Sequence, residues 1–297
     1  MHDIAIFHCA YHWFQKTDIA HHALEKLSQS KIRNVKIIGR RGPLQVAFTI
    51  KEFREMTRLP GNSHKIHISP KDIEDIEAQL AKVSRPRKRL TELILQSAKL
   101  KEDNPTWEML FCRSPIELVR SNGSQSVGSL VLGINQLLGD LVGNSTVQDT
   151  GVREVISCGL VLKSIGYKSV PLSDELPFDS NRGIIRQSQG RVEGLPGVYC
   201  SGWLSTGPVG VIASTLQSGH DVGRIILEDL KKQVGRTGEK MGWNMILPLL
   251  KSKGVEPVTF EQWERLDQEE QKRGEKVQKP REKITNVTEM LDFVKKS

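Results

Sequence analysis

The sequence predicts an α/β protein whose ligands bind at the carboxyl ends of the sheet strands. A helical pattern at residues 17–30 precedes a short apolar run, residues 31–39, that leads into Arg40 and Arg41. A second apolar run, residues 197–202, leads through a glycine-rich turn into a long helical stretch. Units of this kind build open α/β sheets, in which ligands occupy the loops after the strands.

The first half of the chain alternates helical and strand-like stretches. Thr17 can cap the first helix, and its apolar residues fall on one face. We expect helices at residues 17–30, 50–57, 71–82 and 90–100, and a buried strand at residues 31–39. Short β-like runs at residues 107–111, 126–134 and 146–148 are separated by Gly, Asn and Ser, which predicts a small antiparallel insertion.

The second half begins with two apolar runs, residues 159–166 and 197–202, that we interpret as buried strands. The long helix after the glycine turn is expected to end near Lys232. Further helices are expected at residues 241–251 and 259–273, followed by a charged linker and a last short helix. The sequence contains no internal repeat.

Composition narrows the function only slightly. The chain has 297 residues and a net charge of +8, which favours an anionic partner such as nucleic acid, a membrane surface, a phosphorylated cofactor or an acidic protein. Its four cysteines form no C-x-x-C pair, so neither a zinc ribbon nor a redox dithiol is predicted. His8 and His12 have no acidic neighbour, so no metal site is predicted. No apolar stretch reaches the roughly 18 residues of a membrane span, and no targeting segment is recognised.

Arg40 and Arg41 are the first candidate binding residues. Guanidinium groups bind phosphate bidentately, and an arginine after this strand of a dinucleotide-binding fold accommodates the 2′-phosphate of NADP. The alternative is a solvated basic turn.

The second candidate is the turn from Gly202 to Ile212, which contains three glycines before a helix. The amino end of a helix can stabilise a phosphate or the electron-rich edge of a reduced flavin, and Trp203 offers a flat face for a ring system. The alternative is a glycine turn beside a core tryptophan.

The third candidate is the basic run Arg85–Arg89, which could meet phosphates or carboxylates. A solvated basic face is the alternative. No aromatic residue interrupts the run, so single-stranded nucleic acid is weakly supported.

Four long segments resemble the NADPH–adrenodoxin (ferredoxin) reductase family. They are residues 35–61, 84–95, 158–169 and 195–230, and the tail after Lys251 is similar too. The resemblance runs from about Thr17 to the C-terminus. It implies a glutathione-reductase-like α/β fold with two dinucleotide-binding domains, of which the FAD domain is incomplete. Residues 17–157 would form a partial NADP-binding domain with the β insertion, and residues 158–297 the C-terminal part of the FAD domain with a helical tail.

Site residues follow from the resemblance position by position. For NADP the implied residues are Arg40 and Arg41 at the 2′-phosphate, Glu52 towards the nicotinamide end, and Gly210. For FAD they are Trp203, Gly210, Val211 and Ile212, and for docking an acidic adrenodoxin they are Arg54, Arg85 and Arg89.

The implied activity is hydride transfer from NADPH to FAD, then single-electron transfer to the [2Fe–2S] centre of an adrenodoxin or ferredoxin. Steroid metabolism and iron–sulfur assembly are the expected pathways. Family likeness also implies a monomer in the mitochondrial matrix, with peripheral membrane association left open and no nucleic-acid partner. The cofactors carry this chemistry, so no proton-shuttling residue is assigned.

The sequence departs from the family at its start and near the glycine turn. Neither glycine fingerprint for a dinucleotide pyrophosphate is found, and residues 1–16 resemble nothing in the family. Ser205-Thr206 stand where Lys-Arg is expected, and Val209 where Thr is expected. We therefore expect poor FAD binding by this chain alone. The alternative function is a non-enzymatic form that keeps NADP binding, ferredoxin docking or both.

Overall fold

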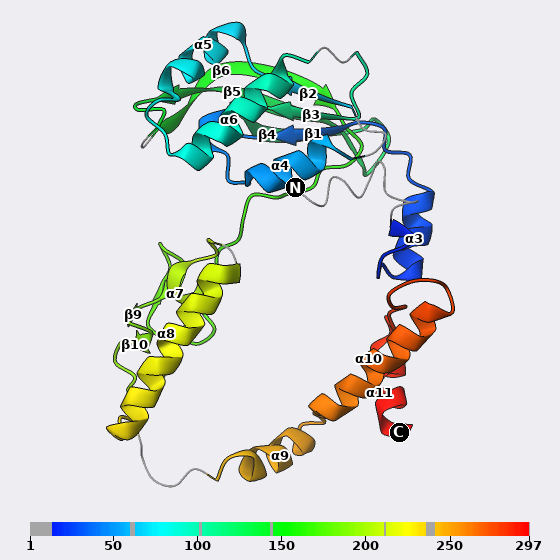
Figure 1. Cartoon of the computed structure of the whole chain (residues 1–297), viewed down its shortest axis with the longest axis vertical. Coiled ribbons are helices and arrows are strands. Elements are labelled where there is room, and N and C mark those ends of the chain that lie inside the picture. Colours follow the sequence, from blue (N-terminus) through cyan, green and yellow to red (C-terminus); the bar gives the residue numbers. More distant parts are fainter. Residues whose placement is uncertain are drawn as a thin grey trace. The chain divides into compact units, whose positions relative to one another are not determined.

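The computed structural model describes residues 14–59, 63–100, 103–142, 145–210, 212–235 and 241–296 (Figure 1). The chain forms two compact units. The first contains Met1–Val161 and Val258–Ser297, and the second contains Leu162–Pro257. The tail therefore groups with the first unit, whereas the sequence led us to expect it in the C-terminal domain.

A three-stranded parallel sheet lies at the centre of the first unit. Its strands are β1 (Val35–Ile38), β2 (His64–His67) and β3 (Trp107–Leu110), in the order β1-β3-β2. Because the three strands are parallel, their carboxyl ends meet at one edge. The predicted strand at residues 31–39 is confirmed. The run at residues 107–111 was placed wrongly in the insertion, because strand pairing over long distances is not visible in local sequence.

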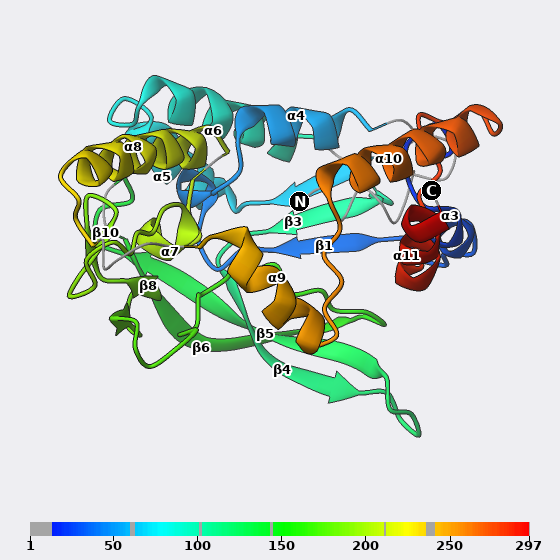
Figure 2. The same ribbon diagram turned by 90° about the horizontal axis from the view of Figure 1, so that it is seen from below.

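Three helices cover one face of this sheet (Figure 2). They are α4 (Ile50–Thr57), α5 (Pro70–Gln79) and α6 (Arg85–Ala98), and a 3₁₀ turn, η1 (Pro43–Gln45), precedes them. The core between helices and sheet fully buries Phe53, Ile94 and Met109. Helix α6 begins at Arg85, earlier than predicted, because Pro86 suits a first helical turn.

The other face carries an antiparallel sheet of β4 (Arg113–Arg120), β5 (Val127–Leu138) and β6 (Thr146–Ser157), in that order (Figure 2). The central strand β5 buries Leu130, Leu132 and Asn135. The predicted antiparallel insertion is confirmed, and its strands are longer than the short runs suggested.

The C-terminal tail makes polar contacts with α3 (His21–Ser28), the first full helix in the described residues, and with the residues just before it. This helix has no side-chain cap of its own, and the Glu282 carboxylate accepts the His21 N–H at 3.1 Å. Lys279 donates to the Ile19 carbonyl at 2.6 Å, and Lys283 pairs with Asp18 at 2.8 Å. Helices α10 (Phe260–Glu275) and α11 (Val287–Lys296) complete the tail.

The second unit is built from short strands and three helices. The strands form the pairs β7 (Phe178–Asp179) with β8 (Ile184–Ile185) and β9 (Gln187–Ser188) with β10 (Arg191–Val192). The helices are α7 (Trp203–Thr206), α8 (Ile212–Lys231) and α9 (Trp243–Ser252). None of the helices in the described residues has both the length and the apolar composition needed to cross a membrane.

The two buried strands predicted for the second half are wrong. Residues 159–166 form no strand, and Leu160, Leu162 and Ile165 are exposed. Residues 197–202 contribute only a single bridge, between Tyr199 and Arg191. A strand needs a neighbour for its backbone N–H and C=O groups, and no described strand pairs with residues 159–166.

Candidate functional site

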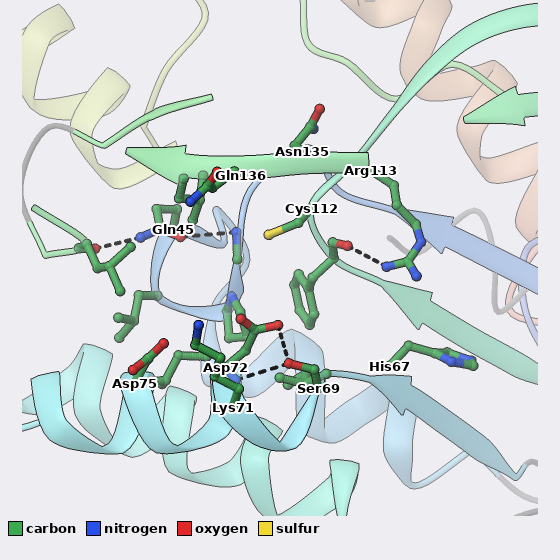
Figure 3. Close-up of a pocket in the computed structure, with 18 of the residues that line it drawn as sticks. Gln45, His67, Ser69, Lys71, Asp72, Asp75, Cys112, Arg113, Asn135 and Gln136 are labelled. Carbon is green, nitrogen blue, oxygen red and sulfur yellow. Dashed lines mark hydrogen bonds between the residues drawn. The ribbon is translucent and has the colours of Figure 1, made fainter. Parts of the chain in front are cut away.

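A cavity of about 730 Å³ opens at the carboxyl ends of β2 and β3 (Figure 3). Ser69, Asp72 and Asp75 at the start of α5 form one wall, and Asn135 and Gln136 of β5 stand opposite. Its apolar lining comes from Leu44, Ile76, Phe111, Leu137 and Leu141. An apolar lining with a few hydrogen-bonding groups suits a flat heterocycle with a polar edge.

Cys112 lines this cavity without being a nucleophile. Burial raises the pKa of its thiol, and the nearby Asp72 carboxylate raises it further. The thiol therefore stays protonated at neutral pH. The backbone of Cys112 is left-handed, with φ of 53°, where β3 turns into β4.

His67, at the cavity edge, is held by a carboxylate of the parallel sheet. Its Nε2 lies 2.7 Å from the Glu108 carboxylate, which also accepts from the Lys36 ammonium on β1. Burial raises the pKa of Glu108, but the bonds from Lys36 and His67 outweigh it and the pKa lies below its ordinary value. Glu108 therefore links all three strands as an anion.

Arg40 and Arg41 follow the end of β1 and directly precede Gly42, the first residue of this loop that lines the cavity. Both side chains are exposed, and no hydrogen bond or ion pair within the described residues occupies either guanidinium group. An adjacent pair of unoccupied guanidinium groups at the carboxyl edge of a sheet can bind a phosphate bidentately.

The loop that carries these arginines is held by the β-sheet insertion. Cys112 donates its N–H to the Arg41 carbonyl at 3.1 Å, and the Asn135 side-chain amide donates to the Arg40 carbonyl at 3.0 Å. Sequence reasoning missed Asn135, because nothing in the local pattern of β5 links it to a loop 95 residues away.

Arg54, Arg85 and Arg89 meet in a second cavity, of about 450 Å³, between α4 and α6. Within the described residues, none of the three guanidinium groups has a carboxylate partner. Unpaired cations brought together repel one another, so this surface is suited to an anionic partner. Arg87 of the same basic run instead donates to the Val46 carbonyl and has a structural role.

Glu52 lies in the first turn of α4, where its carboxylate accepts the N–H and hydroxyl of Thr49 at 2.6 and 2.9 Å. This contact is a helix capping box. The geometry therefore gives Glu52 a local structural role. Its proposed contact near the nicotinamide stays a prediction.

The glycine turn of the second unit presents an open surface. Trp203 is half-exposed and stacks on Tyr167 at 6.4 Å between ring centroids, and Ile212 is 88% exposed. Gly210 has φ of 92°, and a Cβ there would lie 2.5 Å from the Ser214 hydroxyl, so only glycine fits. Val211 lies outside the described residues.

Comparison with known proteins identifies close relatives. No family model matches the chain. The chain is 43% identical, over 292 residues, to the mitochondrial NADPH:adrenodoxin oxidoreductase of Salvelinus fontinalis, and 43% identical over 287 residues to that of Homo sapiens. It is 34% identical over 281 residues to the NADPH-ferredoxin reductase FprA of Mycobacterium leprae.

Among solved structures, Mycobacterium tuberculosis FprA in complex with NADPH matches with a TM-score of 0.85 and 32% identity, over 99% of this chain and 64% of that one. The likeness confirms the fold class expected from the sequence. The match covers 93–95% of this chain but only 58–60% of the length of these curated relatives.

Proposed function

Since the chain belongs to the NADPH:adrenodoxin oxidoreductase and FprA family, we propose that it takes part in electron transfer from NADPH to a ferredoxin of the adrenodoxin type. Its own residues supply two sites for this task. The arginine pair beside the larger cavity binds NADP, and the three arginines of the smaller cavity dock the acidic partner.

The observation that carries the NADP site is the unoccupied guanidinium pair at the carboxyl end of β1. Arg40 and Arg41 grip the 2′-phosphate, and the adjoining apolar cavity is large enough for the adenine. Charge-assisted hydrogen bonds contribute about 1.5–3 kcal/mol each, so the pair sets a strong preference for NADP over NAD.

Calorimetry with 2′,5′-ADP and 5′-AMP tests this site, because the two ligands differ only in the 2′-phosphate. Arg40→Ala with Arg41→Ala should weaken 2′,5′-ADP by about 100-fold or more and leave 5′-AMP nearly unchanged. The matched control is Lys31→Ala with Arg33→Ala, two exposed cations before the same strand. Equal losses for both ligands would reject the assignment.

The docking site rests on charge. Three arginines without carboxylate partners attract the acidic surface that carries a [2Fe–2S] centre, and this attraction raises the association rate at low salt. Arg85→Glu with Arg89→Glu should lower ferredoxin affinity and flatten its salt dependence. The control is Lys82→Glu with Lys88→Glu, outside the cavity. An unchanged salt dependence in the arginine variant would place docking elsewhere.

The glycine turn of the second unit is the proposed contact surface for FAD. Trp203, Gly210 and Ile212 offer an open face for the flavin ring, and the chain has no glycine fingerprint for its pyrophosphate. A bound flavin would accept hydride from NADPH and release single electrons. Trp203, Gly210 and Ile212 would contact the flavin ring on one side, and no step is assigned to them. A flavin absorbance band that survives desalting, with NADPH-dependent reduction of a ferredoxin, tests whether the chain alone is active.

The cellular location and the oligomeric state are proposed from the same family relationship. We propose a mitochondrial protein, as the names of the mitochondrial relatives suggest. The proposal includes a monomeric state and peripheral association with the inner membrane. Fractionation of mitochondria with a carbonate wash, and light scattering of the purified chain, would measure these properties. Recovery in another compartment, or as a stable dimer, would contradict them.

A further inference from the structure

The loop that carries the arginine pair is held mainly by its neighbours. Beyond the end of β1, three successive carbonyl groups accept hydrogen bonds from outside the loop. The Gly39 carbonyl accepts from the Arg113 N–H at 3.0 Å and the Arg41 carbonyl from the Cys112 N–H at 3.1 Å. The carbonyl between them, that of Arg40, accepts from the side chain of Asn135 at 3.0 Å.

Asn135 is itself held by burial and by three hydrogen bonds that it donates. Its side chain is on a residue only 7% exposed, and its second amide hydrogen goes to the Ser114 hydroxyl at 2.8 Å. Its backbone N–H donates to the Cys112 carbonyl at 2.8 Å, at a register shift between β5 and β6. A carbonyl oxygen only accepts, so the group that faces Arg40 must be the NH₂ end of the amide.

We propose that Asn135 is a positioning residue that sets the preference for NADP by fixing the peptide between Arg40 and Arg41. This inference rests on the proposed 2′-phosphate role of the two arginines. The side chains of Arg40 and Arg41 are long and exposed. The positions of their Cα atoms therefore decide whether both guanidinium groups can reach one phosphate. With the Arg40 carbonyl released, that peptide can rotate and the two groups diverge.

The effect is therefore specific to the extra phosphate. Asn135 lines the cavity proposed for the adenine, but both of its amide hydrogens are already donated, to the Arg40 carbonyl and the Ser114 hydroxyl. A ligand without the 2′-phosphate should therefore lose little affinity when the bond to Arg40 is removed. Asn135→Ala should weaken 2′,5′-ADP about fivefold to tenfold, as expected for one positioning hydrogen bond, and leave 5′-AMP within twofold. Asn135→Asp keeps the shape and places a carboxylate against the Arg40 carbonyl, so its loss should be larger.

Two controls separate positioning from general loosening of the fold. Gln148→Ala removes an exposed amide from β6, opposite Gln136 in the same sheet, and should leave both ligands within twofold. Ser114→Ala removes the other partner of the Asn135 amide and leaves the bond to Arg40, so its effect should be small. Thermal melting of each variant reports the fold itself.

The decisive measurement is a double-mutant cycle by calorimetry. In the Arg40→Ala, Arg41→Ala background, Asn135→Ala should cause no further loss of 2′,5′-ADP affinity. Equal losses in both backgrounds, or an equal loss for 5′-AMP, would overturn the positioning role. If Asn135→Ala does not fold, the same cycle with the isosteric Asn135→Asp decides.

The two proposals fail differently. If the arginine variant binds 2′,5′-ADP as tightly as the unchanged chain, or the unchanged chain shows no saturable binding, the NADP site is wrong and the role of Asn135 falls with it. If the arginine variant loses affinity while Asn135→Ala and Asn135→Asp do not, the NADP site stands and only the positioning role of Asn135 is rejected.

Discussion

Two apolar runs of the chain were both predicted as buried strands, and only one of them forms a strand. Residues 35–38 form β1 and pair with β3 in the parallel sheet. Residues 159–166, half of which are Val, Leu or Ile, remain without a strand partner and expose Ile165 by 86%. The difference teaches that an apolar run indicates the capacity to form a strand, and that the neighbouring strand decides whether one forms.

The two units also differ in how far they bury their large apolar side chains. The first unit fully buries Phe53, Ile94 and Met109 between helices and sheet. The second unit leaves large side chains exposed along its length, including Leu172 and Ile212 at 88%. A well-defined polar contact lies within this unit. The Asp229 carboxylate is nearly buried and accepts two hydrogen bonds from Arg191 and one from Tyr199, which join β10 to α8.

The largest effect should come from the core of the first unit. Phe53→Ala removes a fully buried ring between α4 and the parallel sheet and should lower the free energy of unfolding by about 3–5 kcal/mol. Urea titration followed by tryptophan fluorescence measures it, because Trp107 lies in that core. A loss below about 1 kcal/mol would show that the sheet and helices do not pack as described.

The sequence predicted more of the first unit than of the second. Helix α4 was placed correctly because Thr49 and Glu52 form a capping box that is local in sequence. Strands β1 and β3 were found as apolar runs, but their pairing joins residues about 70 positions apart and could not be read from either run. The strand predicted at residues 159–166 was wrong for the same reason, because the apolar pattern does not show whether a partner strand is present.

The candidate sites divide in the same way. Arg40 and Arg41 could be proposed from the sequence because they are two adjacent residues directly after a strand. Arg54 joins Arg85 and Arg89 only through the packing of α4 on α6, so the family resemblance implies this group whereas the spacing along the chain does not. Asn135 left no trace in sequence, because its role depends on a contact between β5 and a distant loop.

An intermediate effect should come from the ionic link within the parallel sheet. Glu108→Gln removes the charge that binds Lys36 and His67, and should cost about 2 kcal/mol at pH 7. The pKa of Glu108 is lowered in the folded chain, so its contribution is present above its unfolded pKa of about 4.3 and is lost as pH falls through the folded value.

Urea titrations of the parent chain and Glu108→Gln at several pH values test both statements. The difference in unfolding free energy should be constant near neutral pH and shrink below about pH 4. Glu55→Gln, in an exposed pair with Lys51 at 3.9 Å, is the matched control and should cost less than about 0.5 kcal/mol. A Glu108 difference that does not change at all as pH falls below about 4 would mean that shape matters at this position and charge does not.

The smallest effect should come from the unpaired run of the second unit. Leu162→Ser with Ile165→Ser changes two exposed side chains, so the free energy of unfolding should shift by less than about 0.5 kcal/mol. The same change should reduce binding of the dye ANS and self-association, since it removes exposed apolar surface. Dye fluorescence and sedimentation measure both, with Leu130→Ser in the buried face of β5 as the contrasting variant. If the exposed pair proved as costly as Leu130, residues 159–166 would have to be packed against a neighbour in solution, and the contrast between the two apolar runs would disappear.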